Sequence, residues 1–590
     1  MFAATLTALI GPINPITQLA RRGASRAVAA AAVAVSVAGA VASSGASAQP
    51  VPPAVEDFFR PPAYAQIELS PDGKTLAALA PIHDRANLVA IDLATRKPLA
   101  LTSFKNEEVD WFDWVNDRRL LFGAIRKRQS DGQRMWLPGP YAIDRDGTRP
   151  RDLSGFRFLV PISRTLGGSA DSDHVLGAQR IDGVSTVARI NTVDDRSTRV
   201  VERAPGPNPS WVVDRHGVVR AAVTRDGASF MQTAWLRRDS DAPWQKLAEW
   251  HQFETTDWRA SLALVGFDYD GSLIVSAVGP QGRRAVYLWD EQANRLGLEL
   301  ASHPTLDVHG SNLIFDPRKR RLVGARIGGG RAEYHWIDDD WARWHAGLTR
   351  ALPGMDLRIE RAAGSDLILV HAASDREPGA YYLFDPATRK LEELVRERPW
   401  IDPRQMGSRE AITYPARDGR TIPAVLTLPP DRVATNLPLV VLVHGGPYVH
   451  GADTFWDAEA QFLATRGYAV LQPAFRGTLG YGLAHEQAGY RQWGLAMQDD
   501  LNDGVKHLAQ RGIADPRRAC VMGASYGGYA ALMGVARDAG FWRCAISYAG
   551  VTDLIEMSTA TYSDTAGWRG RDDWMRKHVG DPDTERDKLR

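Results

Sequence analysis

Two patterns of hydrophobic and polar positions divide the chain. From about Ile67 to Asp385, short apolar strands with alternating polar positions recur, separated by turns that contain Asp-Gly or a similar pair. Such alternation is typical of half-buried antiparallel strands. From Ile422 onward the apolar runs are continuous and alternate with helical spacing, which is typical of buried strands in an α/β unit. The pattern therefore predicts two structural units that meet near residues 399–409.

The first unit repeats. Its clearest copy runs from Ile67 to Leu79 around the turn Pro71-Asp72-Gly73. Later copies begin at Trp114, Trp211, Phe267 and Ile314, and their partner strands are Tyr141–Asp144, Val187–Ile190, Val286–Asp290, Tyr334–Ile337 and Tyr381–Asp385. A period of about 40 to 55 residues matches a four-stranded propeller blade, and about seven blades fit the length. An array of β-sandwiches is the alternative, but unequal repeats without Pro-rich linkers favour a closed ring.

The second unit is predicted to be an α/β domain with a mostly parallel sheet. Its expected strands are Leu439–Val443, Ala469–Pro473, Cys520–Gly523 and Cys544–Tyr548. A helix is expected over 496–511, because Leu501, Val505 and Leu508 share one face.

The amino terminus has the layout of a secretory signal. Arg21, Arg22 and Arg26 precede an apolar run of about 16 residues, which ends in the small residues Ala46-Ser47-Ala48. Because this run is shorter than the roughly 20 residues that span a bilayer, a cleaved signal over 1–48 is favoured over an uncleaved anchor. We expect a periplasmic or secreted protein without stable membrane insertion, with a propeller over 49–405 and an α/β domain over 406–590.

Charge and composition limit the kinds of ligand and partner that the sequence predicts. Lys and Arg total 71 against 70 Asp and Glu, so the net charge of +1 provides no field for nucleic acid. The histidines are scattered and form no cluster with cysteine, which predicts neither a metal nor a cofactor. Cys520 and Cys544, the two cysteines, lie in apolar segments and are interpreted as buried free thiols.

The chemistry centres on Gly523-Ala-Ser-Tyr-Gly527, a G-x-S-x-G sequence between an apolar strand and a helix. A sharp strand-to-helix turn would expose the hydroxyl of Ser525 as a nucleophile, and the flanking glycines would relieve crowding. His444-Gly445-Gly446-Pro447 follows the strand 439–443, where a hydrolase places its oxyanion loop. His444 is interpreted as orienting that loop rather than as a general base, because its place in chain order does not fit.

Residues 411–590 resemble the catalytic domain of the prolyl oligopeptidase family, serine peptidases that include acylaminoacyl peptidases and dipeptidyl peptidases. The matching motifs are residues 416–419, 444–447, 476–482, 499–500, 515–517, 523–529 and 580–582. The resemblance implies cleavage of short peptides in a cavity between propeller and hydrolase domain. It also implies that the backbone amides of Gly446 and Tyr526 hold the oxyanion, with no cofactor.

One departure from the family concerns the acid and base, which follow the nucleophile in the order Ser, Asp, His. Only 65 residues follow Ser525, and their single histidine, His578, lies in a segment that resembles a surface stretch of the family. We expect the triad Asp and His to lie beyond Arg590, as in a truncated chain. An esterase and a catalytically inactive peptide-binding fragment are the alternatives.

Two further charged features are open to interpretation. Glu107-Glu108 is similar to the pair with which dipeptidyl peptidases hold a substrate amine, but a charged loop is the favoured interpretation. Arg476 is either structural or substrate-facing. The sequence leaves open the residue before the scissile bond, the choice between internal, dipeptidyl and acylaminoacyl cleavage, and the oligomeric state.

Overall fold

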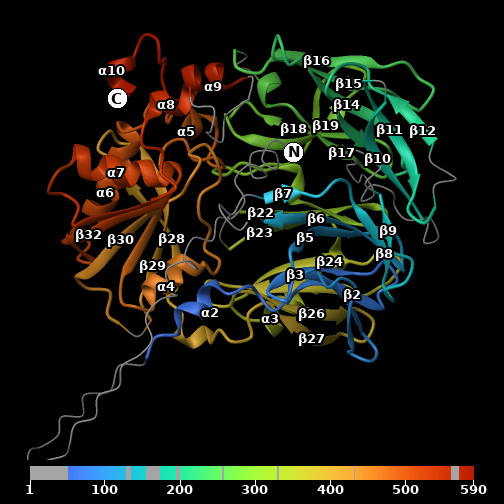
Figure 1. Ribbon diagram of the computed structural model, residues 1–590, viewed down its shortest axis with the longest axis horizontal. Coiled ribbons are helices and arrows are strands. Elements are labelled where there is room, and N and C mark those ends of the chain that lie inside the picture. The colour runs from blue at the N-terminus through green and yellow to red at the C-terminus, as the bar shows by residue number, and fades with distance from the viewer. Residues whose placement is uncertain are drawn as a thin grey trace, which may run out of the picture.

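The computed structural model describes residues 51–127, 134–153, 173–181, 183–194, 199–254, 258–328, 331–430, 432–559 and 570–589. The predicted signal over 1–48 lies outside these residues and stays a prediction. Strands coloured from blue to yellow make up one half of the molecule, and an orange and red part with strands and helices makes up the other (Figure 1).

Within the described residues, the first half contains seven antiparallel sheets that follow one another along the chain. Their strands are β1 (Ala65–Leu69), β2 (Thr75–Ile82), β3 (Arg85–Asp92) and β4 (Pro98–Ala100); β5 (Glu107–Trp114), β6 (Arg119–Lys127), β7 (Arg134–Trp136), β8 (Tyr141–Asp144) and β9 (Arg151–Asp152); β10 (His174–Ile181), β11 (Val184–Asn191) and β12 (Arg199–Arg203); β13 (Ser210–Val213), β14 (Val219–Arg225), β15 (Met231–Leu236) and β16 (Gln245–His251); β17 (Ala263–Phe267), β18 (Leu273–Val278), β19 (Arg284–Asp290) and β20 (Arg295–Ala301); β21 (Leu313–Asp316), β22 (Arg321–Ile327) and β23 (Glu333–Trp336); β24 (Asp356–Arg361), β25 (Ile368–Ala373), β26 (Ala380–Asp385) and β27 (Lys390–Arg396). The predicted repeats are therefore propeller blades. The predicted number of about seven blades is confirmed.

The first blade closes the ring. Alternate residues of β2 and β3 face opposite sides, as the period of two requires. Ala77 and Leu88 pack against the second sheet, in a cluster with Phe112. Leu76 packs on the other side against Leu369 of the seventh sheet. Because the first sheet contacts both its successor and the last sheet, the fold is a closed propeller rather than a row of sandwiches.

One blade departs from the repeat. After β23 the chain forms helix α3 (Asp339–Ala351), where the repeat period predicted only strands. The Asp338 carboxylate caps this helix by accepting hydrogen bonds from the backbone amides of Asp340 and Trp341. Trp341 is fully buried against the neighbouring blade. The helix thus replaces a strand because its cap and its aromatic face have partners.

The second half is built on a six-stranded mixed sheet in the order β28-β29-β31-β30-β32-β33. Its strands are β28 (Ser408–Pro415), β29 (Thr421–Leu428), β30 (Leu437–Val443), β31 (Ala469–Pro473), β32 (Ala514–Ala524) and β33 (Cys544–Tyr548). The last four pair in parallel, and β28 and β29 pair antiparallel at one edge. The predicted α/β hydrolase sheet is confirmed.

Helices flank this sheet on both faces (Figure 1). The remaining helices are α2 (Val55–Phe59), α4 (Ala458–Ala464), α5 (Leu483–Gln487), α6 (Ala496–Gln510), α7 (Tyr526–Arg537), α8 (Leu554–Thr559), α9 (Arg571–His578) and α10 (Arg586–Leu589), with short 3-10 turns η2 (Trp258–Ser261), η3 (Gly310–Asn312) and η4 (Pro403–Gln405). Leu501, Val505 and Leu508 of α6 are fully buried, as their spacing predicted.

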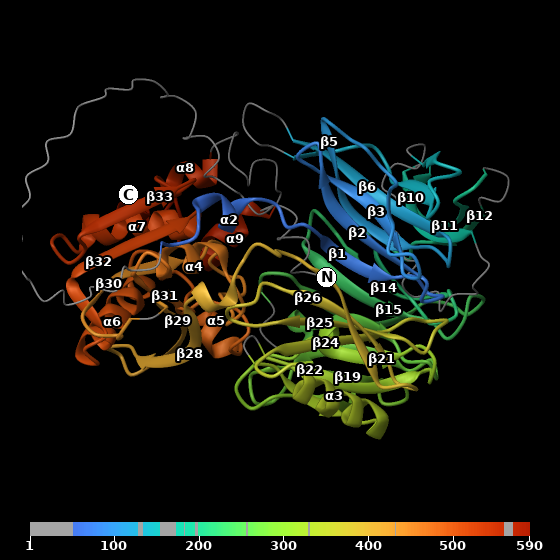
Figure 2. The ribbon, with the colours of Figure 1, turned by 90° about the horizontal axis from the view of Figure 1, so that it is seen from below.

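The two halves are joined at several points. Near the amino terminus, α2 packs against α4 of the hydrolase half through Phe58 and Phe462, although the sequence placed residues 49–405 with the propeller (Figure 2). The Gln461 amide donates to the carbonyl oxygen of Asp375 in the propeller half. These contacts fix the orientation of the hydrolase sheet relative to the ring.

Within the described ranges, the helices are all too short or too polar to cross a membrane.

Candidate functional site

Ser525 occupies the turn between β32 and α7. Its backbone has φ 53° and ψ −118°, outside the regions that residues with a side chain prefer. The turn is nevertheless held, because its amide donates to Tyr548 and its carbonyl accepts from the amide of Tyr529. The side chain is half-buried at the carboxyl edge of the sheet. This is the predicted strand-to-helix elbow.

Glycines make the turn possible. A Cβ atom on Gly523 would lie 2.5 Å from the carbonyl oxygen of Val443, and one on Gly527 would lie 2.1 Å from the same oxygen. Both distances are far below van der Waals contact, and the obstacle is backbone. The two glycines therefore let the elbow pack directly against the end of β30.

The predicted oxyanion loop lies beside the nucleophile. An added Cβ on Gly445 would be 3.5 Å from the Cβ of Ser525, so the loop after β30 contacts the elbow. Gly446 has φ +115°, a conformation that favours glycine. Tyr526 is the first residue of α7, where backbone N–H groups lack acceptors within the helix. The structure thus brings Gly445, Ser525 and Tyr526 together; the oxyanion role of Gly446 and Tyr526 stays a prediction.

His444 supports this loop. Its Nδ1 donates to the Gly445 carbonyl at 2.7 Å, so Nε2 accepts from the Thr478 hydroxyl at 3.0 Å. The ring stacks on Phe475, and burial lowers the pKa of His444 to about 4. Because both ring nitrogens are engaged and the ring is neutral, the geometry agrees with a loop-orienting histidine.

His578 lies in an aromatic cluster rather than on the surface that its sequence context suggested. Its Nδ1 is 2.9 Å from the carbonyl oxygen of Trp574, and its ring packs against Tyr448 and Tyr490. Burial lowers its pKa to about 4. Among the described residues, no histidine forms a hydrogen bond with the Ser525 hydroxyl.

Arg476 is structural. Its backbone amide and Nε donate to Asp500 Oδ2 at 3.0 and 2.9 Å, its Nη2 donates to Asp500 Oδ1 at 2.7 Å, and its Nη1 donates to Asp418 at 2.8 Å. Arg476 and Asp500 are both buried. Burial raises the pKa of Asp500, whereas the paired arginine lowers it. A guanidinium with these partners ties the loop after β31 to α6 and does not face a substrate.

Glu107 and Glu108 begin β5 instead of lying in a loop. Glu107 pairs with Arg126 and Glu108 with Arg85, at 2.5 and 3.3 Å. Both carboxylates therefore already have cationic partners within the propeller, in agreement with a structural role.

The interpretation of the cysteines as buried free thiols is wrong. Cys520 of β32 and Cys544 of β33 form a disulfide, and Cys544 is exposed. The two strands pair in parallel with these residues directly opposite, Cα to Cα 4.7 Å. Spacing in the sequence could not reveal this, because the register of two strands linked by a helix is a tertiary feature.

A cavity of about 1010 Å³ lies between the propeller and the β28–β29 hairpin. Ser525, Gly446 and Tyr526 are not among the residues that line it, so this cavity and the predicted nucleophile are separate. In the described part of the chain, no three His, Cys, Asp or Glu side chains gather into a metal site.

Together, a closed propeller and a parallel sheet with a nucleophile elbow define a propeller-bearing α/β hydrolase. Residues 454–585 match the model of the prolyl oligopeptidase family. The chain therefore contains a domain of that family, as its motifs implied.

Relatives and solved structures extend this likeness. The chain is 25% identical over 550 residues to dipeptidyl aminopeptidase BIII of Pseudoxanthomonas mexicana, covering 91% of this chain and 76% of the relative. It is 33% identical over 222 residues to dipeptidyl peptidase family member 6 of Caenorhabditis elegans, covering 34% of this chain and 30% of that relative. A puromycin-hydrolyzing peptidase of Mycobacterium tuberculosis superposes with a TM-score of 0.63 at 17% identity, over 90% of this chain and 83% of that one. Prolyl oligopeptidase B of Galerina marginata superposes with a TM-score of 0.63 at 13% identity, over 91% of this chain and 79% of that one. The structural matches show the fold.

Proposed function

We propose that the protein is a serine peptidase that cleaves short peptides through an acyl-enzyme on Ser525. The observation that carries this proposal is the Ser525 elbow, held at φ 53° against Gly445 within a domain of the prolyl oligopeptidase family. Local strain held by surrounding structure is typical of a nucleophile in this fold.

The proposed chemistry begins when the Ser525 oxygen adds to the scissile carbonyl carbon and its proton passes to a general base. The backbone amides of Gly446 and Tyr526 stabilise the negative oxygen, and the dipole of α7 adds positive potential there. The C–N bond then breaks, the amine leaves with the proton, and Ser525 is left as an ester. Water hydrolyses this ester and restores the hydroxyl.

Within the described ranges, no hydrogen bond joins a histidine to the Ser525 hydroxyl, and His444, His485 and His578 instead hydrogen-bond to backbone carbonyls. A serine hydroxyl without a base is a poor nucleophile at neutral pH. The proposed catalysis therefore needs a general base from outside the described residues.

The test compares substrates on the full chain and on Ser525→Ala. We expect Ala-Pro or Ala-Ala 4-nitroanilide to be hydrolysed by the wild type and not by the variant, and a fluorophosphonate to label only the wild type. Faster hydrolysis of the anilide with a free amino terminus than of the same anilide with an N-acetyl group would indicate dipeptidyl cleavage. The name of the Pseudoxanthomonas relative describes this type of cleavage.

Two alternatives have their own signatures. Turnover of a short acyl ester without any peptide anilide would replace the peptidase with an esterase, because the same elbow serves both reactions. Tight peptide binding without Ser525 labelling would indicate a peptide-binding protein. Either result would overturn the proposed activity.

The site of action is a separate proposal, supported by the layout of residues 1–48. We expect export to the periplasm or medium, with a mature chain that begins at Gln49. Amino-terminal sequencing of protein from each cell fraction tests this, and a cytoplasmic chain that retains Met1 would contradict it.

A further inference from the structure

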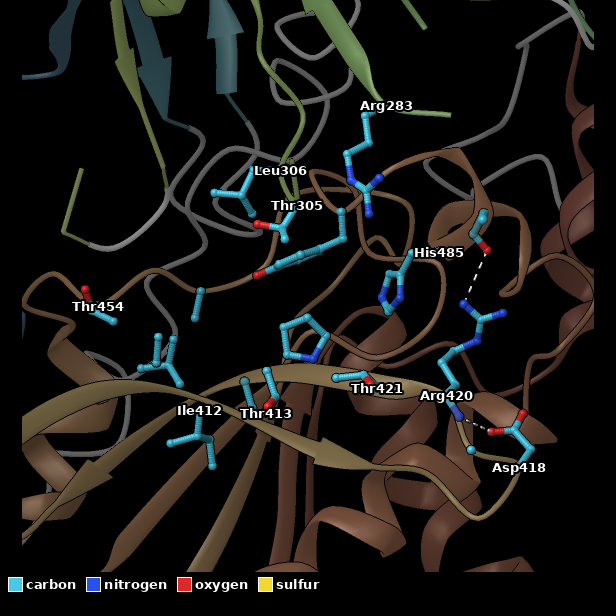
Figure 3. A pocket seen from close by; sticks show the side chains of 18 residues that line it. Arg283, Thr305, Leu306, Ile412, Thr413, Asp418, Arg420, Thr421, Thr454 and His485 are labelled. Atoms are coloured by element: carbon cyan, nitrogen blue, oxygen red, sulfur yellow. Dashed lines mark hydrogen bonds between the residues drawn. The ribbon is translucent and has the colours of Figure 1, made fainter. Parts of the chain in front are cut away.

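The cavity between the two halves has walls from both. Arg283, Thr305 and Leu306 come from the propeller, and Arg420 and Thr421 come from the β28–β29 hairpin of the hydrolase half. Figure 3 shows the Arg283 side chain entering from the propeller side, with His485 between it and the hairpin. A space of about 1010 Å³ is at the upper end for small-molecule sites.

Two arginines of this cavity lack anionic partners. The Nε atoms of Arg283 and Arg420 are buried without a hydrogen-bond acceptor. Neither guanidinium forms an ion pair within the described ranges; Arg420 makes only a long contact of 3.5 Å from Nη1 to the Ala484 carbonyl. Most buried donors in proteins are satisfied, so two buried Nε donors without an acceptor on one cavity indicate a missing acceptor.

Both arginines border the same short segment of the hydrolase half. A Cβ on Gly482 would lie 3.2 Å from Arg283 Cγ, which places this side chain over Gly482. Arg420 reaches Ala484, two residues further on. The two guanidiniums therefore approach one stretch of chain from opposite domains.

Nearby acids are engaged elsewhere. Asp418 accepts from Arg476, and Asp307 accepts from the backbone amides of Arg284 and Gly482. His485 holds Nε2 against the carbonyls of Ala474 and Phe475, and burial, with help from Arg420, lowers its pKa. Of the charged side chains that line the cavity, the two cations Arg283 and Arg420 outnumber the one anion, Asp418.

We propose that this cavity is a second ligand site, which binds the carboxylate of a small ligand with an apolar body between Arg283 and Arg420. The guanidinium fork matches a carboxylate, and Ala411, Pro423 and Val425, which share one face of the β28–β29 hairpin, provide an apolar floor. The Asp418 carboxylate at the rim disfavours a dianion such as phosphate more than a monoanion. The site does not depend on the chemistry of Ser525.

The test measures binding to the full chain carrying Ser525→Ala, which prevents turnover. Isothermal titration calorimetry compares acetyl-Ala-Phe as the free acid, its carboxamide and inorganic phosphate. We expect the free acid to bind at least about tenfold more tightly than the other two, because only the acid supplies both the monoanion and the apolar body.

Arginine variants locate the site. We expect Arg283→Gln and Arg420→Gln each to weaken the free acid about tenfold and to leave the carboxamide unchanged, whereas Arg283→Lys weakens the acid less. Arg404→Gln is the matched control, because Arg404 is highly exposed and is not among the residues that line the cavity. Circular dichroism and thermal unfolding establish that each variant is folded.

Three outcomes would overturn the proposal. They are equal affinity for acid and carboxamide, unchanged acid affinity in both folded glutamine variants, and phosphate binding as tightly as the peptide acid. The first two would remove the carboxylate site, and the third would replace it with a general anion site. Loss of Ser525 reactivity would not affect any of them.

Discussion

The backbone around Ser525 is packed so closely that a single added carbon atom would change it. Gly527 faces the carbonyl oxygen of Val443 at a distance that no side chain tolerates. We expect Gly527→Ala to lower the free energy of unfolding by about 3 kcal/mol, because two backbone segments must separate. Urea unfolding measures this, and fluorophosphonate labelling reports whether the elbow survives.

Gly347 provides the control for that substitution. It lies inside α3, and a Cβ there meets no atom within 4 Å. Gly347→Ala should therefore raise the unfolding free energy by about 0.5 to 1 kcal/mol through helix propensity. Equal effects at the two glycines would contradict the role of close packing at the elbow.

At the next scale, the Arg476–Asp500 pair connects the loop after β31 to helix α6. Asp500→Ala leaves a buried guanidinium without its main partner, so we expect a loss of about 3 to 5 kcal/mol. Arg404→Ala, which breaks the exposed pair between Arg404 and Asp402, should cost less than about 1 kcal/mol. Chemical unfolding of both variants checks the difference, and similar losses would show that burial of the pair is unimportant.

Two further elements, β32 and β33, are joined by the Cys520–Cys544 disulfide, which closes a loop with a sequence separation of 24. We expect reduction to destabilise the hydrolase half by about 3 kcal/mol. Thermal unfolding with and without a reductant measures this effect, and Cys544→Ser should unfold alike in both conditions. Two titratable thiols in the native, unreduced protein would refute the bond.

Across the whole molecule, buried histidines couple stability to pH. Burial lowers the pKa values of His309 in the propeller and of His444 and His578 in the hydrolase half to about 4. The unfolded chain takes up these protons near pH 6.5, whereas the native protein does not. Stability should thus be full above about pH 6.5 and fall toward pH 4, by at most about 1.4 kcal/mol per pH unit for each histidine.

Urea unfolding at pH 7.5 and pH 5 tests this dependence. We expect His309→Asn to make the pH dependence of the unfolding free energy shallower, because asparagine does not take up this proton while His444 and His578 still do. His83→Asn is the control at an exposed position, and it should leave the slope unchanged. A flat profile in the wild type would contradict the prediction.

Much of this architecture follows from local patterns. Alternating strands with Asp-Gly turns predicted the blades, and the run 439–443 followed by His-Gly-Gly-Pro predicted a loop that does contact Ser525. Helix α6 was predictable because its buried residues recur at helical spacing. Each of these features depends on residues close together in the chain, so the sequence by itself determined them.

Contacts between distant segments needed the tertiary structure. Helix α3 depends on a cap and on aromatic partners in another blade, and the disulfide depends on the register of β32 and β33. The cavity brings Arg283 within reach of a hairpin about 140 residues further along the chain, a juxtaposition that only the docking of the two halves produces. The sequence determined the elements and the nucleophile, because periodicity and turn chemistry are local. The tertiary structure decided which charges are paired and which remain unpaired, because burial and distance are properties of the folded chain alone.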